Sequence, residues 1–375
     1  MCGRHDDSCL GIHAAEPDTP KSTTRNLRNL PLSRPLRTEY QYSNIMYVVA
    51  SYMIEVLSGE TFADFLKSQI WDPLGMANTY LDIAGVENHN ATEYLARAYR
   101  WDERAGCYVD IPWFKQPEAQ GSGSVYSSVK DYAKWIQAMI NHTSPLPPTA
   151  YKELTKPRTI MPEEEDRIPF HSQSMYALGW VVETYRGRQV IGHGGNDCGF
   201  ESLMQYLPEL EWGIVICGNS NGAGDAAWIL YGHLVDELLG VPSSERFDWA
   251  ALARERNAKD KKEHLFPEQP NPPLPMSVPI SHFTGRYHNS GYHDLVLVVK
   301  DGKLQADCTD RTLGSVCTFE HVSGNAFVAE MQDLLGDKRR MKAEFLLDEG
   351  GYVRSLGVTF VAEMEDERIW FRKFE

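Results

Sequence analysis

The chain has 375 residues, of which 42% are hydrophobic and 11% aromatic, enough to build more than one globular domain. Its formal net charge of -15 argues against a nucleic-acid partner, because such proteins carry a basic face. No run of about 18 apolar residues occurs, and residues 1–10 lack the basic and apolar stretches of a signal peptide. Seven cysteines without a Cys-x-x-Cys pair indicate free thiols. We therefore expect a cytoplasmic protein with no membrane segment.

Three helices are predicted first, each from an apolar run with a recognisable start or stop. The second and third begin with capping boxes, in which a Ser or Thr side chain and an acidic residue three positions later satisfy each other's backbone N–H groups. The predicted helices are 45–57, ending at Gly59; from Thr61, with Asp64 as box partner, to the stop at Asp72-Pro73-Leu74-Gly75; and from Ser128, with Asp131 as box partner, through Met139.

Four strands and a further helix are predicted next. The turn Pro208–Glu211 lies between the third and fourth strands, so we expect these two to pair as an antiparallel hairpin. The predicted strands are Met175–Tyr185, Gln189–Gly192, Leu203–Leu207 and Gly213–Cys217, and the helix is Asp225–Leu239.

A charged and then proline-rich segment divides the chain. Residues 257–279 contain six prolines, a composition that we expect to exclude both a helix and a central strand. Beyond it, Leu295 and Leu297 begin an alternation with the period of a strand, which stops at the turn Asp301-Gly302. We predict a first domain at 1–256, a linker at 257–279 and a small antiparallel barrel or sandwich at 280–375.

Two short motifs bring polar side chains to the ends of predicted elements. Tyr42-Ser43-Asn44 starts the first helix, where a phenol near cations can act as a general base or acid and an amide can orient a neighbouring group. Gly192-His193-Gly194-Gly195-Asn196 follows a strand, and its glycines let a carbonyl oxygen approach N–H groups that can bind an oxyanion. Taken alone, each motif is more often an ordinary helix start or a tight turn with a surface histidine.

In this order, the motifs resemble those of the serine β-lactamase and penicillin-binding-protein-like hydrolases. The resemblance covers most of residues 1–240, and residues 280–375 resemble the small barrel appended to esterase and peptidase members. It implies an α/β (α+β) fold in which helices flank an antiparallel sheet, beside an all-helical part. The segments that carry the resemblance are Tyr42-Ser43-Asn44, Trp71–Met76, Gly123–Trp135, Leu178-Gly179-Trp180 and His193-Gly194-Gly195.

The resemblance implies acyl transfer through a serine ester, using Ser-x-x-Lys, Tyr-x-Asn and either Lys-Thr-Gly or a His-x-Gly variant. By residue match, Tyr42 takes the role of the general base and Asn44 that of a positioning amide. His193 and Gly195 fall on the third motif, and a strand N–H near Asn196 would supply part of an oxyanion hole. A histidine there resembles the esterase, transesterase and D-amino-acid peptidase branches, because neutral imidazole binds a carboxylate less well than lysine does. A small-molecule acyl substrate is implied, without metal or organic cofactor.

The Ser-x-x-Lys element is missing upstream of Tyr42, and residues 4–11 resemble the loop that follows the nucleophile helix in relatives. We therefore expect the sequence to begin inside the domain. Ser127 and Lys130 spell Ser-x-x-Lys, but Ser127 directly precedes a helix cap. Ser220 lies in a Gly-x-Ser-x-Gly sequence between a strand and a helix, but a nucleophile elbow needs a parallel strand, and this strand is expected to be antiparallel.

Three functional hypotheses stay open at this point. The chain is a truncated hydrolase or transacylase, an inactive relative that binds a small acyl compound or a partner, or an elbow-type hydrolase that uses Ser220. Cys198 is expected to be a small buried thiol. His282, His288 and His293 do not have the spacing of metal ligands.

Overall fold

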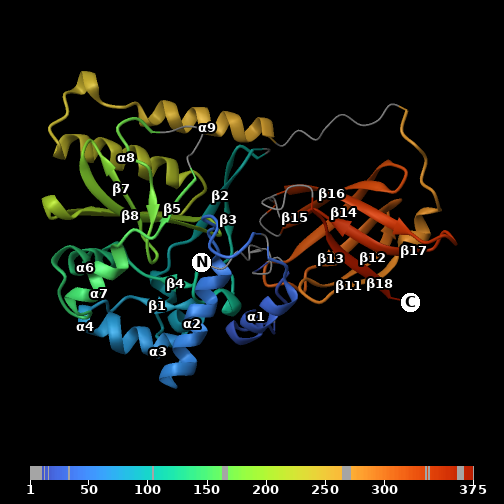
Figure 1. Cartoon of the computed structure of the whole chain (residues 1–375), viewed down its shortest axis with the longest axis horizontal. Helices are drawn as coiled ribbons and strands as arrows, with labels where there is room; N and C mark the ends of the chain where they lie inside the picture. Colours follow the sequence, from blue (N-terminus) through green and yellow to red (C-terminus); the bar gives the residue numbers. More distant parts are fainter. Residues whose placement is uncertain are drawn as a thin grey trace.

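The computed structural model has two bodies, a helix-and-sheet domain and a β-barrel (Figure 1). It describes residues 11, 13–15, 17–32, 34–103, 105–162, 168–263, 272–333, 336, 338–360 and 367–374, with the backbone alone for 259–263. The helices are α1 (Pro20–Asn26), α2 (Asn44–Ser58), α3 (Phe62–Leu66), α4 (Asp72–Leu74), α5 (Asp82–Asn88), α6 (Val129–Asn141), α7 (Pro148–Thr155), α8 (Ala223–Leu238) and α9 (Trp249–Glu263). The strands of the first domain are β1 (Tyr80–Leu81), β2 (Ala98–Asp102), β3 (Cys107–Ile111), β4 (Val125–Tyr126), β5 (Thr159–Ile160), β6 (Met175–Tyr176), β7 (Val181–Tyr185), β8 (Arg188–Asp197), β9 (Phe200–Leu207) and β10 (Trp212–Gly218).

The first domain is built around a six-stranded antiparallel sheet in the order β10-β9-β8-β7-β6-β5. Successive residues of a strand point to opposite faces, and the buried side chains follow this period. Ile191 of β8 and Tyr206 of β9 pack with α6 and α7. Val190 and Leu207, each the neighbour of one of these, pack with α8 on the other face. Helices therefore cover both faces of the sheet, which confirms the predicted fold class.

The second domain is a closed barrel of eight strands in sequence order, each paired antiparallel with its neighbours. Aromatic rings fill its interior: the ring of Phe345 lies 4.7 Å from that of Phe283 and 5.2 Å from that of Phe327. Because the sheet closes on itself, it has no open edge. The predicted barrel is confirmed. Its strands are β11 (Gly285–Asn289), β12 (His293–Lys300), β13 (Lys303–Cys308), β14 (Ser315–Ser323), β15 (Ala326–Asp333), β16 (Lys338–Leu347), β17 (Val353–Val358) and β18 (Ile369–Phe374).

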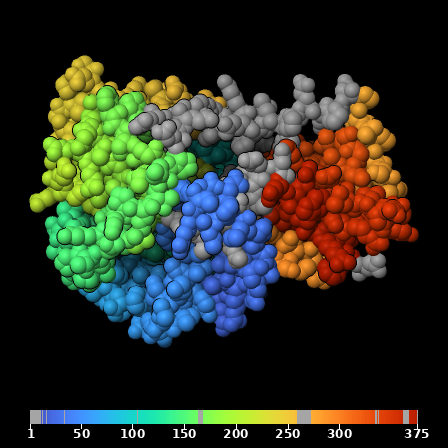
Figure 2. All heavy atoms as spheres, viewed as in Figure 1, coloured from blue at the N-terminus to red at the C-terminus, as the bar shows by residue number. Residues whose placement is uncertain are grey.

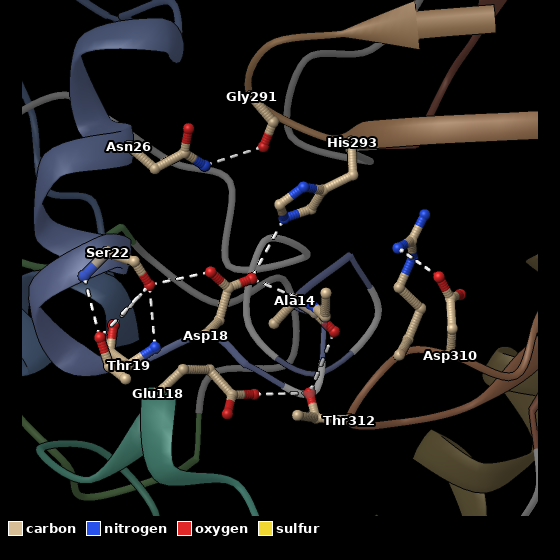
Figure 3. Close-up of polar contacts among 12 residues, drawn as sticks. Ala14, Asp18, Thr19, Ser22, Asn26, Glu118, Gly291, His293, Asp310 and Thr312 are labelled. Carbon is tan, nitrogen blue, oxygen red and sulfur yellow. Dashed lines mark hydrogen bonds and ion pairs between the residues drawn. The ribbon is translucent and has the colours of Figure 1, made fainter.

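The segment around α1, blue in Figure 2, lies between the two domains. The Asn26 side chain donates a hydrogen bond to the Gly291 carbonyl at 2.9 Å, and Nε2 of His293 lies 3.1 Å from Oδ2 of Asp18 (Figure 3). The Thr312 hydroxyl of the barrel donates to Oε1 of the fully buried Glu118 at 2.6 Å. Polar contacts therefore fix the barrel to the first domain.

The four predicted helices and one predicted pairing are confirmed. The helix expected over 45–57 is α2. Ser128 caps α6 as expected, since its side chain accepts a hydrogen bond from the Asp131 N–H at 3.2 Å. Strand β10 pairs antiparallel with β9.

Three other elements differ from their predictions. The strand expected over 175–185 is two strands, because a turn with Gly179 at a φ of 80° separates β6 from β7. The strand expected to end at Gly192 continues as β8 to Asp197, so His193 lies within a strand. Helix α9 extends to Glu263, into the expected linker, because no proline precedes Pro267 there.

Replacing Phe345 by alanine is expected to lower the free energy of unfolding by about 3–5 kcal/mol, because a buried ring leaves a cavity. Leu346 is the matched control: it is the next residue of β16 and is 45% exposed, whereas Phe345 is 1% exposed. Chemical denaturation of Phe345→Ala and Leu346→Ala measures the difference. Equal losses in the two variants would contradict the inward orientation of Phe345.

Candidate active site

Four tyrosine side chains from three segments of the first domain gather around His193. The Tyr42 ring lies 5.9 Å from the His193 ring and 6.1 Å from that of Tyr176. The Tyr176 ring is also 5.9 Å from His193 and 5.4 Å from Tyr40, and Tyr47 lies 6.2 Å from Tyr42. The structure thus brings together the Tyr-x-Asn and His-x-Gly motifs, which lie far apart in the sequence.

Two hydrogen bonds connect three of these side chains in a row. The hydroxyl oxygens of Tyr47 and Tyr176 are 2.8 Å apart, and the Tyr176 hydroxyl lies 3.1 Å from Nε2 of His193. On the other side of the imidazole, Nδ1 lies 2.6 Å from the Gly194 carbonyl oxygen. Both ring nitrogens of His193 therefore have hydrogen-bond partners within the protein.

The turn before α2 positions the first motif. Ser43 is the N-cap residue with an extended φ of -153°, and Asn44 is the first residue of the helix. Tyr47 follows three residues after Asn44, which places the two on neighbouring positions of one helix face. The sequence of α2 therefore supplies both the predicted residue Asn44 and a tyrosine of the hydrogen-bonded row.

The His-x-Gly motif lies on a part of β8 that has a neighbouring strand on one side only. The pairing of β7 with β8 ends at Gly192, whereas the pairing of β9 with β8 continues to Asp197. Backbone groups of an antiparallel strand point alternately to its two sides. Alternate N–H groups between His193 and Asp197 therefore face away from β9, and Gly195 and Asn196, both exposed, lie in this stretch. An N–H group of this kind can supply part of an oxyanion hole, and that role of the stretch stays a prediction.

Burial raises the pKa of three of the four tyrosines in the cluster. It raises the pKa of Tyr40 to about 12. Burial also raises the pKa of Tyr47 and, more strongly, that of Tyr176, where the hydrogen bond with Tyr47 adds to the effect. These three phenols are therefore protonated at neutral pH and able to donate hydrogen bonds. The general-base role of Tyr42 stays a prediction.

The alternative serines lie in other surroundings. The Ser127 hydroxyl is 2.7 Å from that of Thr79, and no hydrogen bond to Lys130 is found among the residues described. Ser220 follows β10, the edge strand of the sheet, in a loop where Tyr99 N–H donates to the Asn219 carbonyl at 2.9 Å. Its φ is not positive, so it does not have the strained backbone of a nucleophile elbow.

Cys198 and two barrel histidines, His288 and His293, have structural partners. The Cys198 sulfur accepts a hydrogen bond from the Gln116 amide at 3.5 Å, and burial together with Asp197 raises the pKa of its thiol. His288 pairs with Asp294 at 2.6 Å. In the described part of the chain, no group of three or more His, Cys, Asp or Glu side chains is arranged to hold a metal ion. No helix there is long and apolar enough to span a bilayer.

Sequence reasoning missed Tyr47 and Tyr176. Each carried a weak signal: Tyr47 lies one helical turn after Asn44, and Tyr176 lies two residues before the recognised Leu178-Gly179-Trp180 segment. Neither spacing predicts that the two hydroxyls meet. That contact depends on how α2 packs beside the sheet.

Gly121 allows the segment after Glu118 to lie directly on α2, since an added Cβ would overlap the Tyr47 carbonyl group. We expect Gly121→Ala to lower the free energy of unfolding by about 1–3 kcal/mol, because the backbone of Tyr47 would have to move. Gly85→Ala is the control: Gly85 is in α5 and an added Cβ there makes only ordinary contacts. Thermal unfolding that is equal for the two variants would contradict this close approach.

Comparison with known proteins places this site in a family. The family model for β-lactamase matches residues 6–236, and a model for a domain of unknown function, DUF3471, matches residues 269–373. The unguisins hydrolases of Aspergillus violaceofuscus and Aspergillus campestris are 34% and 33% identical, over 98% and 99% of this chain and 70% of each relative. The octameric penicillin-binding protein homologue from Pyrococcus abyssi has a similar fold, with a TM-score of 0.52 and 21% identity over 94% of this chain and 70% of that one. The chain belongs to the β-lactamase family of serine hydrolases.

Proposed function

We propose that this chain is a β-lactamase-related serine hydrolase or acyltransferase that acts on an ester or amide of a small molecule. The observation that carries the proposal is the 5.9 Å approach of the Tyr42 and His193 rings, which joins two of the family's three motifs in one site. The Aspergillus relatives are named as hydrolases of unguisins, which supports hydrolysis as the reaction class.

The proposed chemistry follows from the groups around β8 and α2. In the family's chemistry, the serine of Ser-x-x-Lys attacks the carbonyl carbon of the substrate, and this sequence has no Ser-x-x-Lys upstream of Tyr42 to supply that serine. Backbone N–H groups near Gly195 and Asn196 stabilise the negative oxygen that forms. Tyr42 exchanges a proton with the attacking and leaving groups, and Asn44 orients the acyl chain. Water or another acceptor then takes the acyl group from the serine ester.

A second candidate has its own support. The sequence contains Ser-x-x-Lys only at Ser127–Lys130, and the Ser127 hydroxyl is hydrogen-bonded to that of Thr79. A relative that binds a small acyl compound without turning it over is compatible with the same aromatic site.

Hydrolysis of p-nitrophenyl butyrate tests the first candidate. We expect Tyr42→Phe to lower kcat/KM by at least about tenfold, because a general acid–base group contributes that much or more. His193→Ala should also lower kcat/KM, because the His193 ring packs beside that of Tyr42. Ser127→Ala and Ser220→Ala are the controls and should leave the rate unchanged. Loss of activity in Ser220→Ala alone would replace the proposal with an elbow-type hydrolase.

If the chain does not hydrolyse the ester, the second candidate, a protein that binds an acyl compound without turning it over, is tested next. Intact-mass spectrometry after treatment with a fluorophosphonate shows whether any serine reacts. Absence of an adduct, together with saturable binding of the amide butyranilide that His193→Ala abolishes, would support the binding protein. A stoichiometric adduct would exclude it and identify the nucleophile by peptide mapping.

A further inference from the structure

We propose that Tyr176 and Tyr47 are positioning residues that hold neutral His193 with its proton on Nδ1, which leaves the imidazole no N–H for a substrate carboxylate. The proposal rests on the proposed function, because it concerns the same site. It assigns to that site a preference for substrates whose acyl group carries no charge where it lies next to His193. Its physical basis is the direction of the three hydrogen bonds around the ring.

The Gly194 carbonyl oxygen fixes the donor-to-acceptor direction of these three hydrogen bonds. A carbonyl oxygen only accepts hydrogen bonds, so Nδ1 of His193, 2.6 Å away, carries the proton. A neutral imidazole has one N–H, and Nε2 is therefore an acceptor. The Tyr176 hydroxyl, 3.1 Å from Nε2, donates to it. Since that hydroxyl has a single proton, its oxygen accepts the bond from Tyr47 at 2.8 Å.

The two tyrosines are suited to this task because they stay protonated and are held in place. Burial raises the pKa of both phenols, so each keeps the proton that it donates. The Tyr176 side chain is 1% exposed and therefore has little freedom to turn away. Tyr47 is part of α2, whose backbone is in close contact with Gly121. A hydroxyl fixed by its surroundings is a stronger constraint on the histidine than water would be.

The consequence for substrates follows from the count of donors. A lysine at the position of His193 would present a positive charge and three N–H donors to a carboxylate. The neutral form of His193 has one N–H, which the Gly194 carbonyl already accepts, and its remaining nitrogen is occupied by Tyr176. An acyl compound with a carboxylate against this ring would find neither a charge nor a donor. The site therefore favours uncharged esters and amides at this position.

Nitrogen-15 NMR of the histidine-labelled chain at pH 8 tests the proposal directly, with His193→Gln used to assign the signals. We expect Nδ1 of His193 to be protonated and Nε2 to be unprotonated and hydrogen-bonded. Tyr176→Phe should shift the Nε2 resonance downfield and leave Nδ1 protonated, and Tyr47→Phe should cause a smaller shift in the same direction. Tyr206→Phe, a buried tyrosine on β9 whose ring packs on Trp180, is the matched control and should change neither signal.

Protonation of Nε2 in the unmodified chain would overturn the proposal without any variant, so the test does not depend on Tyr176→Phe folding. An Nε2 resonance that is the same in Tyr176→Phe and the unmodified chain would also overturn it. Sodium acetate serves as the carboxylate probe, against sodium chloride at equal ionic strength. We expect no difference between the two salts, and acetate-induced double protonation of His193 would contradict the substrate preference. These readouts do not require acyl transfer, so they separate this inference from a failure of the proposed function.

Discussion

The hydrogen-bonded row from Tyr47 through Tyr176 to His193 is the interaction on which the site depends. It joins α2, β6 and β8, three elements that share no backbone pairing across the row. With these hydroxyls in place, the turn that carries Tyr42 faces the strand that carries His193. A half-buried polar row whose members are all hydrogen-bonded favours one arrangement of its elements, because any other leaves donors without partners.

The barrel contributes to the same arrangement from the other side of α2. Ile45 directly follows Asn44, is completely buried, and belongs to one apolar cluster with Leu30 and the barrel interior. Glu118 adds a polar contact, since its Oε1 accepts hydrogen bonds from both the Gly11 N–H and the Thr312 hydroxyl. The segment that follows Glu118 reaches Gly121, which lies against Tyr47. The second domain therefore supports the first turn of the helix that carries the Tyr-x-Asn motif.

Local patterns predicted the parts of this structure that depend on near neighbours. The cap at Ser128 and the hairpin of β9 and β10 depend on residues that are close together in the sequence, and both are confirmed. The extent of β8 was not predictable in this way. The glycines after His193 are typical of a turn, and they remain in a strand because β9 pairs with them through Asp197. The roles of Tyr47 and Tyr176 depend on packing between separate elements, for which the sequence has no local signal. Tyr42 and His193 were found because they lie within motifs of a recognised family, and their chemical roles stay predictions.

A double-mutant cycle between Tyr176 and His193 tests most directly whether the row is one interacting unit. The free energy of unfolding would be measured for the unmodified chain, Tyr176→Phe, His193→Ala and the double variant. A hydrogen bond between the two side chains predicts a coupling free energy of about 0.5–1.5 kcal/mol. Strict additivity, with no coupling, would show that the two side chains do not depend on each other and would contradict the account.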